Sequence, residues 1–433
     1  MLQITETYSG QENTPGPFSP NIGAYRPATP PAAGTVLPNP ISIMSRDLKM
    51  PSVFKVSLAT DIKLPWGVVG SLEGIFNKDL STALFRNANL VDPEPLNVAG
   101  YPDNRMIYPS APTDKFINPI LGGQAVPNGT VMPSGPQPGA FNVIVLDNAK
   151  KGYYYSVSAS VEKNFASGFG LRLSYIKSGA KSLFEGSGDQ AQSSWQSTNT
   201  VNGANAPVLG YSGFVPPDRI IGSLSYRKEF LKHLGTQITL LYDGSNGRKS
   251  YTYSGDLNRD GASGDLIYVP KDPSEITFVP MTTGSGDNAV TYTPQQQSDF
   301  FFRYIEDDDY LRGRKGQYAE RNAAITPFQG RFDFRFQQDL FVNVGGKRNT
   351  IQFTWDVINF GNLLNRNWGT RINSGTSSIL VPANAGDLVP GGTTRPTFRL
   401  ATDNNLPISH RYTDNVGYSS TFEMQFGFRY IFN

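Results

Sequence analysis

The 433-residue chain contains no cysteine, so neither disulfides nor thiolate metal sites hold its fold. It has no run of 18 or more apolar residues, which excludes a membrane-spanning helix. Its first residues, MLQITETYSGQENTPG, carry neither the basic nor the apolar region of a signal peptide. A formal net charge of +2 gives no argument for a nucleic-acid partner. Spanning by β-strands stays open, because a transmembrane strand needs only about 9–11 residues.

The residues that are abundant favour strands, turns and long loops over helices. There are 44 glycines and 32 prolines, and aromatic residues make up 12% of the chain. The mean hydropathy is −0.34, far from that of a helical membrane protein. Residues 1–52 are rich in proline and are predicted to be a loop segment, while residues 53–433 carry the regular patterns.

The chain ends in a run in which every second residue is large and apolar. The apolar positions are Phe422, Met424, Phe426, Phe428, Tyr430 and Phe432, with Glu423, Gln425 and Arg429 among the residues between them. A period of two predicts a β-strand with one apolar and one polar face. Eight earlier segments alternate in the same way, at residues 54–64, 68–79, 153–164, 169–179, 219–230, 236–244, 330–342 and 349–360.

Two further features separate a barrel from a soluble β fold. The connections alternate between a few residues and several tens of residues, and outer-membrane barrels have short turns at one rim and long loops at the other. The polar faces carry charge at mid-strand, which a dry core would not tolerate and a wet lumen would. The charged positions are Asp61, Glu73, Glu162, Arg172, Asp243, Asp333, Arg335 and Asp356. These features predict an all-β fold, an antiparallel transmembrane β-barrel with short periplasmic turns and long extracellular loops.

Nine strands are an odd number, whereas bacterial single-chain barrels have even numbers of strands. An unpaired edge in lipid would leave backbone groups without hydrogen bonds. We therefore expect the chain to be the C-terminal portion of a larger barrel, which also fits the missing signal peptide.

Four segments, in order, resemble the C-terminal barrel half of TonB-dependent receptors, most of all the Oar-like branch found in Bacteroidota. They are KMPSVFKVSLATDIKLPWG, YSGDLNRDGASGDLIYVP, YIEDDDYLRGRKGQYAERNAAITPFQGRFDFRFQQDL and WDVINFGNLLNRNWG. The resemblance covers the chain from about residue 40.

The resemblance implies a 22-stranded barrel of the bacterial outer membrane, about nine strands of which lie in this chain, with an N-terminal plug. Such a receptor imports an extracellular ligand with energy passed through TonB. The implied partners are outer-membrane lipid, the TonB complex through the plug, and the barrel-assembly machinery through the C-terminal strand. The plug and the TonB-contacting segment have no counterpart in this sequence.

The stretch DLNRDGASGD is the sharpest local motif. Asp256, Asn258, Asp260 and Asp265 supply oxygen atoms at short spacing around Gly261, as in the start of a calcium loop. The EF-hand pattern would have Glu at the twelfth position, where Ile267 stands. The motif predicts a structural Ca²⁺ site that stiffens a long loop; the alternative is a polar turn that uses these residues for its backbone.

Two other stretches have simpler interpretations. The acidic run 306–310, followed by several arginines, is predicted to be a solvated loop with local ion pairs rather than a ligand site. The tyrosines Tyr251, Tyr253 and Tyr268 could stack on a sugar or peptide, but a place in an interface girdle or packing within loops is the better interpretation.

Signatures of enzymes are missing from the sequence. His233 and His410 are the only histidines, there is no G-x-S-x-G, and VGGKRN lacks the spacing and the Ser/Thr of a P-loop. We therefore predict a receptor and not an enzyme, without naming its ligand. The alternatives are a secreted or surface-exposed β-rich adhesin with calcium-stiffened loops and, behind it, a β-fold glycan hydrolase.

Overall fold

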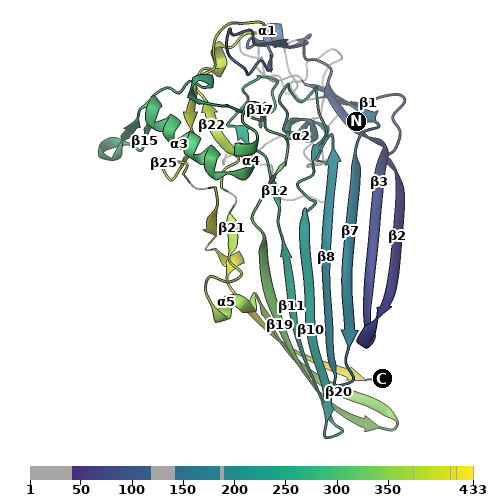
Figure 1. Cartoon of the computed structure of the whole chain (residues 1–433). Helices are drawn as coiled ribbons and strands as arrows, with labels where there is room; N and C mark the ends of the chain where they lie inside the picture. The colour runs from purple at the N-terminus through teal and green to yellow at the C-terminus, as the bar shows by residue number, and fades with distance from the viewer. Residues whose placement is uncertain are drawn as a thin grey trace, which may run out of the picture.

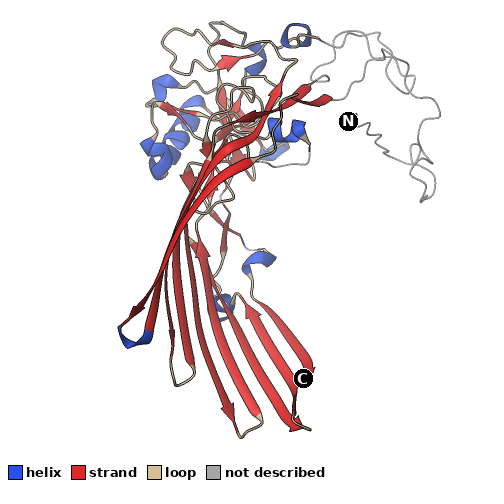
Figure 2. Ribbon diagram, turned by 90° about the vertical axis from the view of Figure 1, so that its right-hand side faces the viewer, coloured by secondary structure: helices blue, strands red, loops and turns tan. Residues whose placement is uncertain are grey.

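The computed structural model describes residues 41–118, 142–185, 190–373, 375–409, 411–415 and 417–432. Residues 1–40 of the predicted loop segment lie outside the described residues. Long strands form one curved sheet, the long connections between them gather at one end of it, and short turns lie at the other end (Figures 1 and 2). None of the helices in the described residues has the length and apolar character needed to span a bilayer.

Nine long strands follow one another through the sheet, and each pairs antiparallel with the next. All nine strands expected from alternation are therefore confirmed, as is the antiparallel β class. They are β2 (Ser52–Leu64), β3 (Val68–Asn87), β7 (Tyr153–Asn164), β8 (Phe169–Ser182), β10 (Asp218–Phe230), β11 (Leu234–Ser245), β19 (Gln329–Val344), β20 (Lys347–Ile358) and β27 (Glu423–Phe432).

The connections differ sharply between the two ends of the sheet. At the short-turn end, two to four residues join β2 to β3, β7 to β8, β10 to β11 and β19 to β20. The turn at Gly345 and Gly346 has φ values of 60° and 79°. Positive φ at both central residues suits a tight two-residue hairpin, and glycine adopts it without steric cost. The described parts of the other connections, which include 88–118 and 246–328, lie at the opposite, long-loop end.

At the long-loop end the sheet gains three short strands. β6 (Val143–Ala149) extends the pairing of β7 along β3, and β9 (Gly210–Tyr211) pairs with the end of β8. β1 (Ile41–Met44) pairs parallel with β6. The sequence predicted no strand before residue 53, because these four residues contain too few alternations to stand out from the proline-rich stretch.

The sheet is open within the described residues. β2 pairs with β3 alone, and β27 pairs with β20 alone. Both outer strands therefore present backbone N–H and C=O groups that have no strand partner in the described part of the chain. Closure of the sheet into a barrel is not observed.

The long connections are folded rather than structureless, which corrects the expectation of plain loops. They contain short helices and small strand pairs, because their apolar residues are numerous enough to form a core of their own. The helices are α1 (Pro112–Lys115), α2 (Ala191–Gln196), α3 (Pro294–Asp307), α4 (Asp309–Gly313) and α5 (Phe360–Leu364). The strands are β4 (Glu94–Pro95), β5 (Met106–Ile107), β12 (Arg248–Lys249), β13 (Thr252–Tyr253), β14 (Tyr268–Val269), β15 (Met281–Thr283), β16 (Val290–Tyr292), β17 (Gln317–Tyr318), β18 (Ala324–Ile325), β21 (Arg371–Asn373), β22 (Ser378–Pro382), β23 (Phe398–Leu400), β24 (Thr402–Asp403), β25 (Leu406–Pro407) and β26 (Thr413–Asn415).

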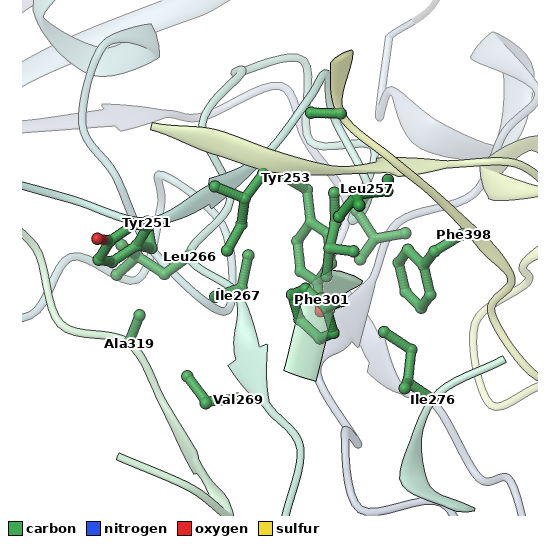
Figure 3. Close-up of a cluster of buried hydrophobic side chains, with 14 of the residues drawn as sticks. Tyr251, Tyr253, Leu257, Leu266, Ile267, Val269, Ile276, Phe301, Ala319 and Phe398 are labelled. Atoms are coloured by element: carbon green, nitrogen blue, oxygen red, sulfur yellow. The ribbon is translucent and has the colours of Figure 1, made fainter. Parts of the chain in front are cut away.

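This body of loops, which we call the loop domain, has its own hydrophobic core (Figure 3). Helix α3 begins with a capping box, in which Thr293 and Gln296 bond each other's backbone N–H groups, and it buries Phe301 and Ile305. Phe278 packs edge-on against Phe301, with ring centroids 5.7 Å apart. Fully buried core residues come from several connections and include Ile107, Tyr251, Leu257, Leu266, Ile267, Val269, Leu311, Ile379, Leu380 and Phe398.

A buried ion pair in the connection after β3 holds residues of the connection 246–328 within the loop domain. The Arg105 Nε donates to both carboxylate oxygens of Asp103 at 3.0 Å, and neither side chain is exposed. The hydroxyls of Tyr253 and Tyr318 donate to the same carboxylate, at 3.3 and 3.1 Å. Arg105 Nη2 also donates to the carbonyl of Leu266. Removal of one partner of such a pair leaves an uncompensated buried charge, which is strongly destabilising.

We expect Arg105→Met to destabilise the loop domain by about 3–5 kcal/mol, because Asp103 would stay buried without its cation. Native-state hydrogen exchange at the amides of Tyr253 and Ile267, both bonded within this domain, measures the effect. The double variant Asp103→Asn/Arg105→Met should recover part of the loss. Arg303→Met, at an exposed position on α3, is the control. Equal protection in Arg105→Met and Arg303→Met would show that the pair is not essential.

Candidate functional site

The register of the sheet places the apolar side of all nine long strands on one face. One row across six strands shows this: it runs through Leu171, Leu224, Leu240, Phe334, Val357 and Met424. Large apolar side chains on this face are exposed to a degree that is unusual for a monomer, with Leu58 at 80% and Phe428 at 79%. Soluble monomers rarely expose contiguous apolar patches above a few hundred Å². The apolar face therefore needs an apolar environment or a partner.

Charged residues bound the apolar face at both ends of the strands. On β10 the outward positions run from Lys228 at the short-turn end through Tyr226, Leu224 and Ile220 to Asp218 at the long-loop end. Ten residues at about 3.3 Å each span about 33 Å. If the strands were tilted by about 40° from a barrel axis, this length along the strand would correspond to a height of about 25 Å along that axis. That is the height of the apolar band of an outer-membrane barrel.

Aromatic rings gather near both boundaries of the apolar face. At the short-turn end, Phe169 packs against Tyr226 with ring centroids 4.6 Å apart. At the long-loop end, Tyr242 packs against Phe332 at 4.8 Å. Tyrosine and tryptophan have an apolar body and a polar tip, which suits the edge between an apolar layer and water. Two bands of this kind are typical of strands that cross a bilayer.

The opposite face of the sheet is polar, and its charges pair across strands. Arg335 makes a bidentate bond to Asp356, at 2.5 and 2.8 Å. The predicted polar position Asp243 binds Arg219 in the same way, with both contacts at 3.0 Å. Glu162 lies directly opposite Arg172 in the register. The eight charged residues expected on the polar face all lie there, because the register keeps odd and even positions on separate sides.

A polar hollow of about 650 Å³ opens on this face near the long-loop end. The long-loop ends of β10, β11 and β19 form one wall, and β21 with the end of β26 forms the other. Three arginines, Arg219, Arg331 and Arg371, line it together with Asp243. Arg331 also pairs with Asp333 at 3.3 Å. A hollow lined in this way suits a small polar or anionic molecule, since guanidinium groups bind carboxylate and phosphate oxygens.

The four residues of the predicted calcium loop come together as a turn in the loop domain. Asp265 accepts bonds from the amides of Leu257 and Asn258 and from the Asn258 side chain, at 2.7 to 3.0 Å. Asp260 accepts bonds from the amides of Ala204 and Ala262. Backbone N–H groups therefore engage these carboxylates, as they do in turns built by Asp and Asn.

The fourth residue of this loop is only partly satisfied. One oxygen of Asp256 accepts a bond from the amide of Gly261 at 2.8 Å, while Oδ1 is buried without a hydrogen-bond partner in the described residues. That oxygen is the group that would receive a cation. The described residues contain no group of three or more Asp, Glu, His or Cys side chains arranged to hold a metal ion. The calcium site stays a prediction.

The carboxylates of this loop are held in their neutral form more strongly than ordinary aspartates. Burial, together with the neighbouring charge of Asp256, raises the pKa of Asp260 to about 7. Burial also raises the pKa of Asp265 well above its usual value, and that of Asp256. The folded loop therefore keeps protons at a pH at which the unfolded chain releases them.

We expect the stability of the loop domain to fall as the pH rises from about 4 to about 7 in the presence of EDTA. In that window the folded state binds more protons at Asp260 than the unfolded state does, so the free energy of unfolding decreases with pH. Thermal unfolding at a series of pH values measures the slope. Asp260→Asn should reduce the slope, because one of the protons involved is no longer available.

The exposed Asp287 offers the matched control, since Asp287→Asn should leave the slope unchanged. A slope that is the same in Asp260→Asn and the unaltered chain would contradict the assignment of the raised pKa to Asp260.

Calcium added above pH 7 tests the predicted metal site in the same assay. If Asp256 is a ligand, millimolar calcium should raise the midpoint in the unaltered chain and not in Asp256→Asn.

The structure tests the interpretations of the acidic run 306–310 and of the three tyrosines. The acidic run 306–310 ends α3 and starts α4, rather than forming a loop, and Asp308 caps α4 through the amides of Tyr310 and Leu311. The predicted local ion pairs are present, at Arg312 with Asp309 and at Lys315 with Glu306. Tyr251, Tyr253 and Tyr268 are buried, so the packing interpretation is confirmed.

The arginine-lined hollow was missed in the sequence, because its residues come from connections and strands far apart in the chain. The register brings Arg219 and Arg331 together beside Asp243, and the amide of Ile372, which donates to the Gln329 side chain, holds Arg371 next to them.

This geometry stands without support from known proteins, as no family model, no curated protein and no solved structure matches the chain.

Proposed function

We propose that the sheet is a segment of the wall of a transmembrane β-barrel in the bacterial outer membrane. In this proposal the apolar face contacts lipid, and the polar face lines a water-filled lumen. The short turns lie on the periplasmic side and the loop domain on the outside of the cell.

The observation that carries the proposal is the continuous apolar face, bounded by aromatic rings and charges at both ends. A second sheet packed on that face would also bury it, as in a soluble sandwich. A sandwich does not need charged boundaries about 25 Å apart, nor two bands of aromatic rings. Lipid accounts for the apolar face, its boundaries and the exposed aromatic residues together.

The open edges also bear on the proposal. Unpaired backbone groups of β2 and β27 would each cost several kcal/mol in hydrocarbon, so a wall must be closed by further strands. The chain alone is therefore expected not to insert stably. In the proposal it is completed by strands of the same kind, as the resemblance to TonB-dependent receptors implies.

We further propose that the complete barrel is a TonB-dependent receptor, which binds an extracellular ligand and imports it with energy from the inner membrane. The loop domain supplies the extracellular surface for capture. The arginine-lined hollow at the top of the polar face is a contact point for a polar or anionic part of that ligand. This proposal rests on the sequence resemblance and on the division between short turns and folded loops.

We expect Leu224→Arg to cost about 2–4 kcal/mol in a bilayer, because Leu224 lies midway along the apolar face. Ser223→Arg, one residue away on the polar face, is the matched control and should cost little. The free energy of unfolding is to be measured with the chain carried in a closed barrel reconstituted in vesicles. Equal costs for the two variants would contradict a lipid-facing role for the apolar face.

The receptor proposal predicts a plug domain encoded in frame ahead of the Met1 codon. Sequencing of the genomic DNA upstream of that codon gives the measurement. A continuous frame with a signal peptide, a plug and further alternating segments would support the proposal. A stop codon just ahead of Met1, with no plug gene nearby, would contradict it.

A further inference from the structure

Just beyond Lys177 and Asp218, at the long-loop end of the apolar face, cations and aromatic rings alternate along one row. The register places Lys78 of β3 opposite Tyr153 of β7, Tyr153 opposite Lys181 of β8, and Lys181 opposite Tyr211 of β9. Lys78, Tyr153 and Lys181 are on the apolar side because they continue the alternation of their strands, and Tyr211 is on the same side because it pairs with Lys181. Neighbouring strands lie about 4.8 Å apart, so the row crosses four strands in about 15 Å.

Arg248 completes this row beyond Tyr211. Its guanidinium carbon lies 4.0 Å from the centre of the Tyr211 ring, and the Lys181 ammonium nitrogen lies 4.3 Å from the same centre. Two cations thus converge on one ring. Such contacts stabilise cations at a partly desolvated site, which keeps both side chains in place.

The three cations of this row form no ion pair within the described residues. Three acids lie near this row. Asp218 binds Lys177 and Asn246, Glu185 binds Asn322 and the amide of Gly213, and Asp79 follows Lys78 on β3. The Arg248 Nε is buried and has no hydrogen-bond partner in the described part of the chain. Asp218 and Asp79 interact with Arg248 and Lys78 only over a distance, so the row keeps cationic donors that no carboxylate occupies.

We propose that Lys181 and Arg248, together with Lys78 along the row, bind the phosphate group of a membrane lipid. The inference rests on the proposed function, because it requires that the apolar face meets lipid. The acyl chains of that lipid would then lie against the apolar face, and its headgroup would stand level with the row.

The chemistry of the row fits a lipid phosphate in particular. Guanidinium and ammonium groups bind phosphate oxygens, and basic clusters at a bilayer surface bind anionic headgroups. Tyr153 and Tyr211 carry a hydroxyl on an apolar ring, which suits the headgroup level of a bilayer. The boundary at the short-turn end differs, since Lys163 and Lys228 each lie over a separate phenylalanine, Phe165 and Phe230.

The test measures binding of short-chain phosphatidic acid to the full chain in nonionic detergent by native mass spectrometry. Phosphatidylcholine of the same chain length and inorganic phosphate serve as comparison probes. Phosphatidic acid should bind more tightly than phosphatidylcholine. In Lys181→Gln/Arg248→Gln its affinity should fall about 30-fold, since two cations near the headgroup are lost.

Lys163→Gln/Lys228→Gln removes the same charge from the same face at the other boundary, and it should leave the affinity unchanged. The exchange Lys181→Arg/Arg248→Lys keeps both charges and should retain most of the affinity, which separates a lost contact from a misfolded chain. Unchanged binding in Lys181→Gln/Arg248→Gln, or an equal loss in the control pair, would overturn the proposal. If inorganic phosphate displaced phosphatidic acid at an equal concentration, the site would bind free phosphate, and the lipid would be overturned as the source of the bound phosphate group.

The result is independent of the Leu224→Arg experiment. Should Leu224→Arg and Ser223→Arg cost the same, the proposed lipid-facing wall fails. If those variants behave as expected but Lys181→Gln/Arg248→Gln binds phosphatidic acid with unchanged affinity, the phosphate site alone fails.

Discussion

Strand register is the constraint on which this structure depends. Side chains alternate with a period of two, so a shift of one residue between any two strands would move a whole strand's apolar side to the polar face. The backbone hydrogen bonds of the nine long strands hold one alignment through to β27, apart from an irregularity between Ser52 and Val53. That alignment produces the apolar face, the paired charges on the other face and the mixed row at the long-loop boundary.

The strands could be predicted because their pattern is local. Eleven residues of alternation at 54–64 are enough to identify a strand without knowing its neighbour. Their ends were harder to place. β3 continues to Asn87 rather than ending near Asp79, since its last residues pair with β6, which is too short to be recognised alone. The loop domain escaped prediction for a related reason: its core joins residues from several connections, and no period links them.

The candidate sites show the same limit. The spacing of residues 256–265 indicated that four oxygen-bearing side chains lie in one turn. It could not indicate the amide of Ala204, which donates to Asp260 and is 56 positions away in sequence. Alternation could have shown that Lys78, Tyr153 and Lys181 share a face with the apolar residues. It could not have shown that they share a row, because the pairing of Lys78 with Tyr153 spans the long connection between β3 and β7.

The contrast between short turns and folded connections has a consequence for how the chain folds. Each hairpin pairs residues that are close in sequence, so it can form early and at a small entropic cost. The Asp103 carboxylate instead binds Tyr253 and Tyr318, at separations of 150 and 215 residues. Such contacts become favourable only after the hairpins have brought the connections to one end. The loop domain is thus expected to be the last part to order, and the hairpins act as the template on which it assembles.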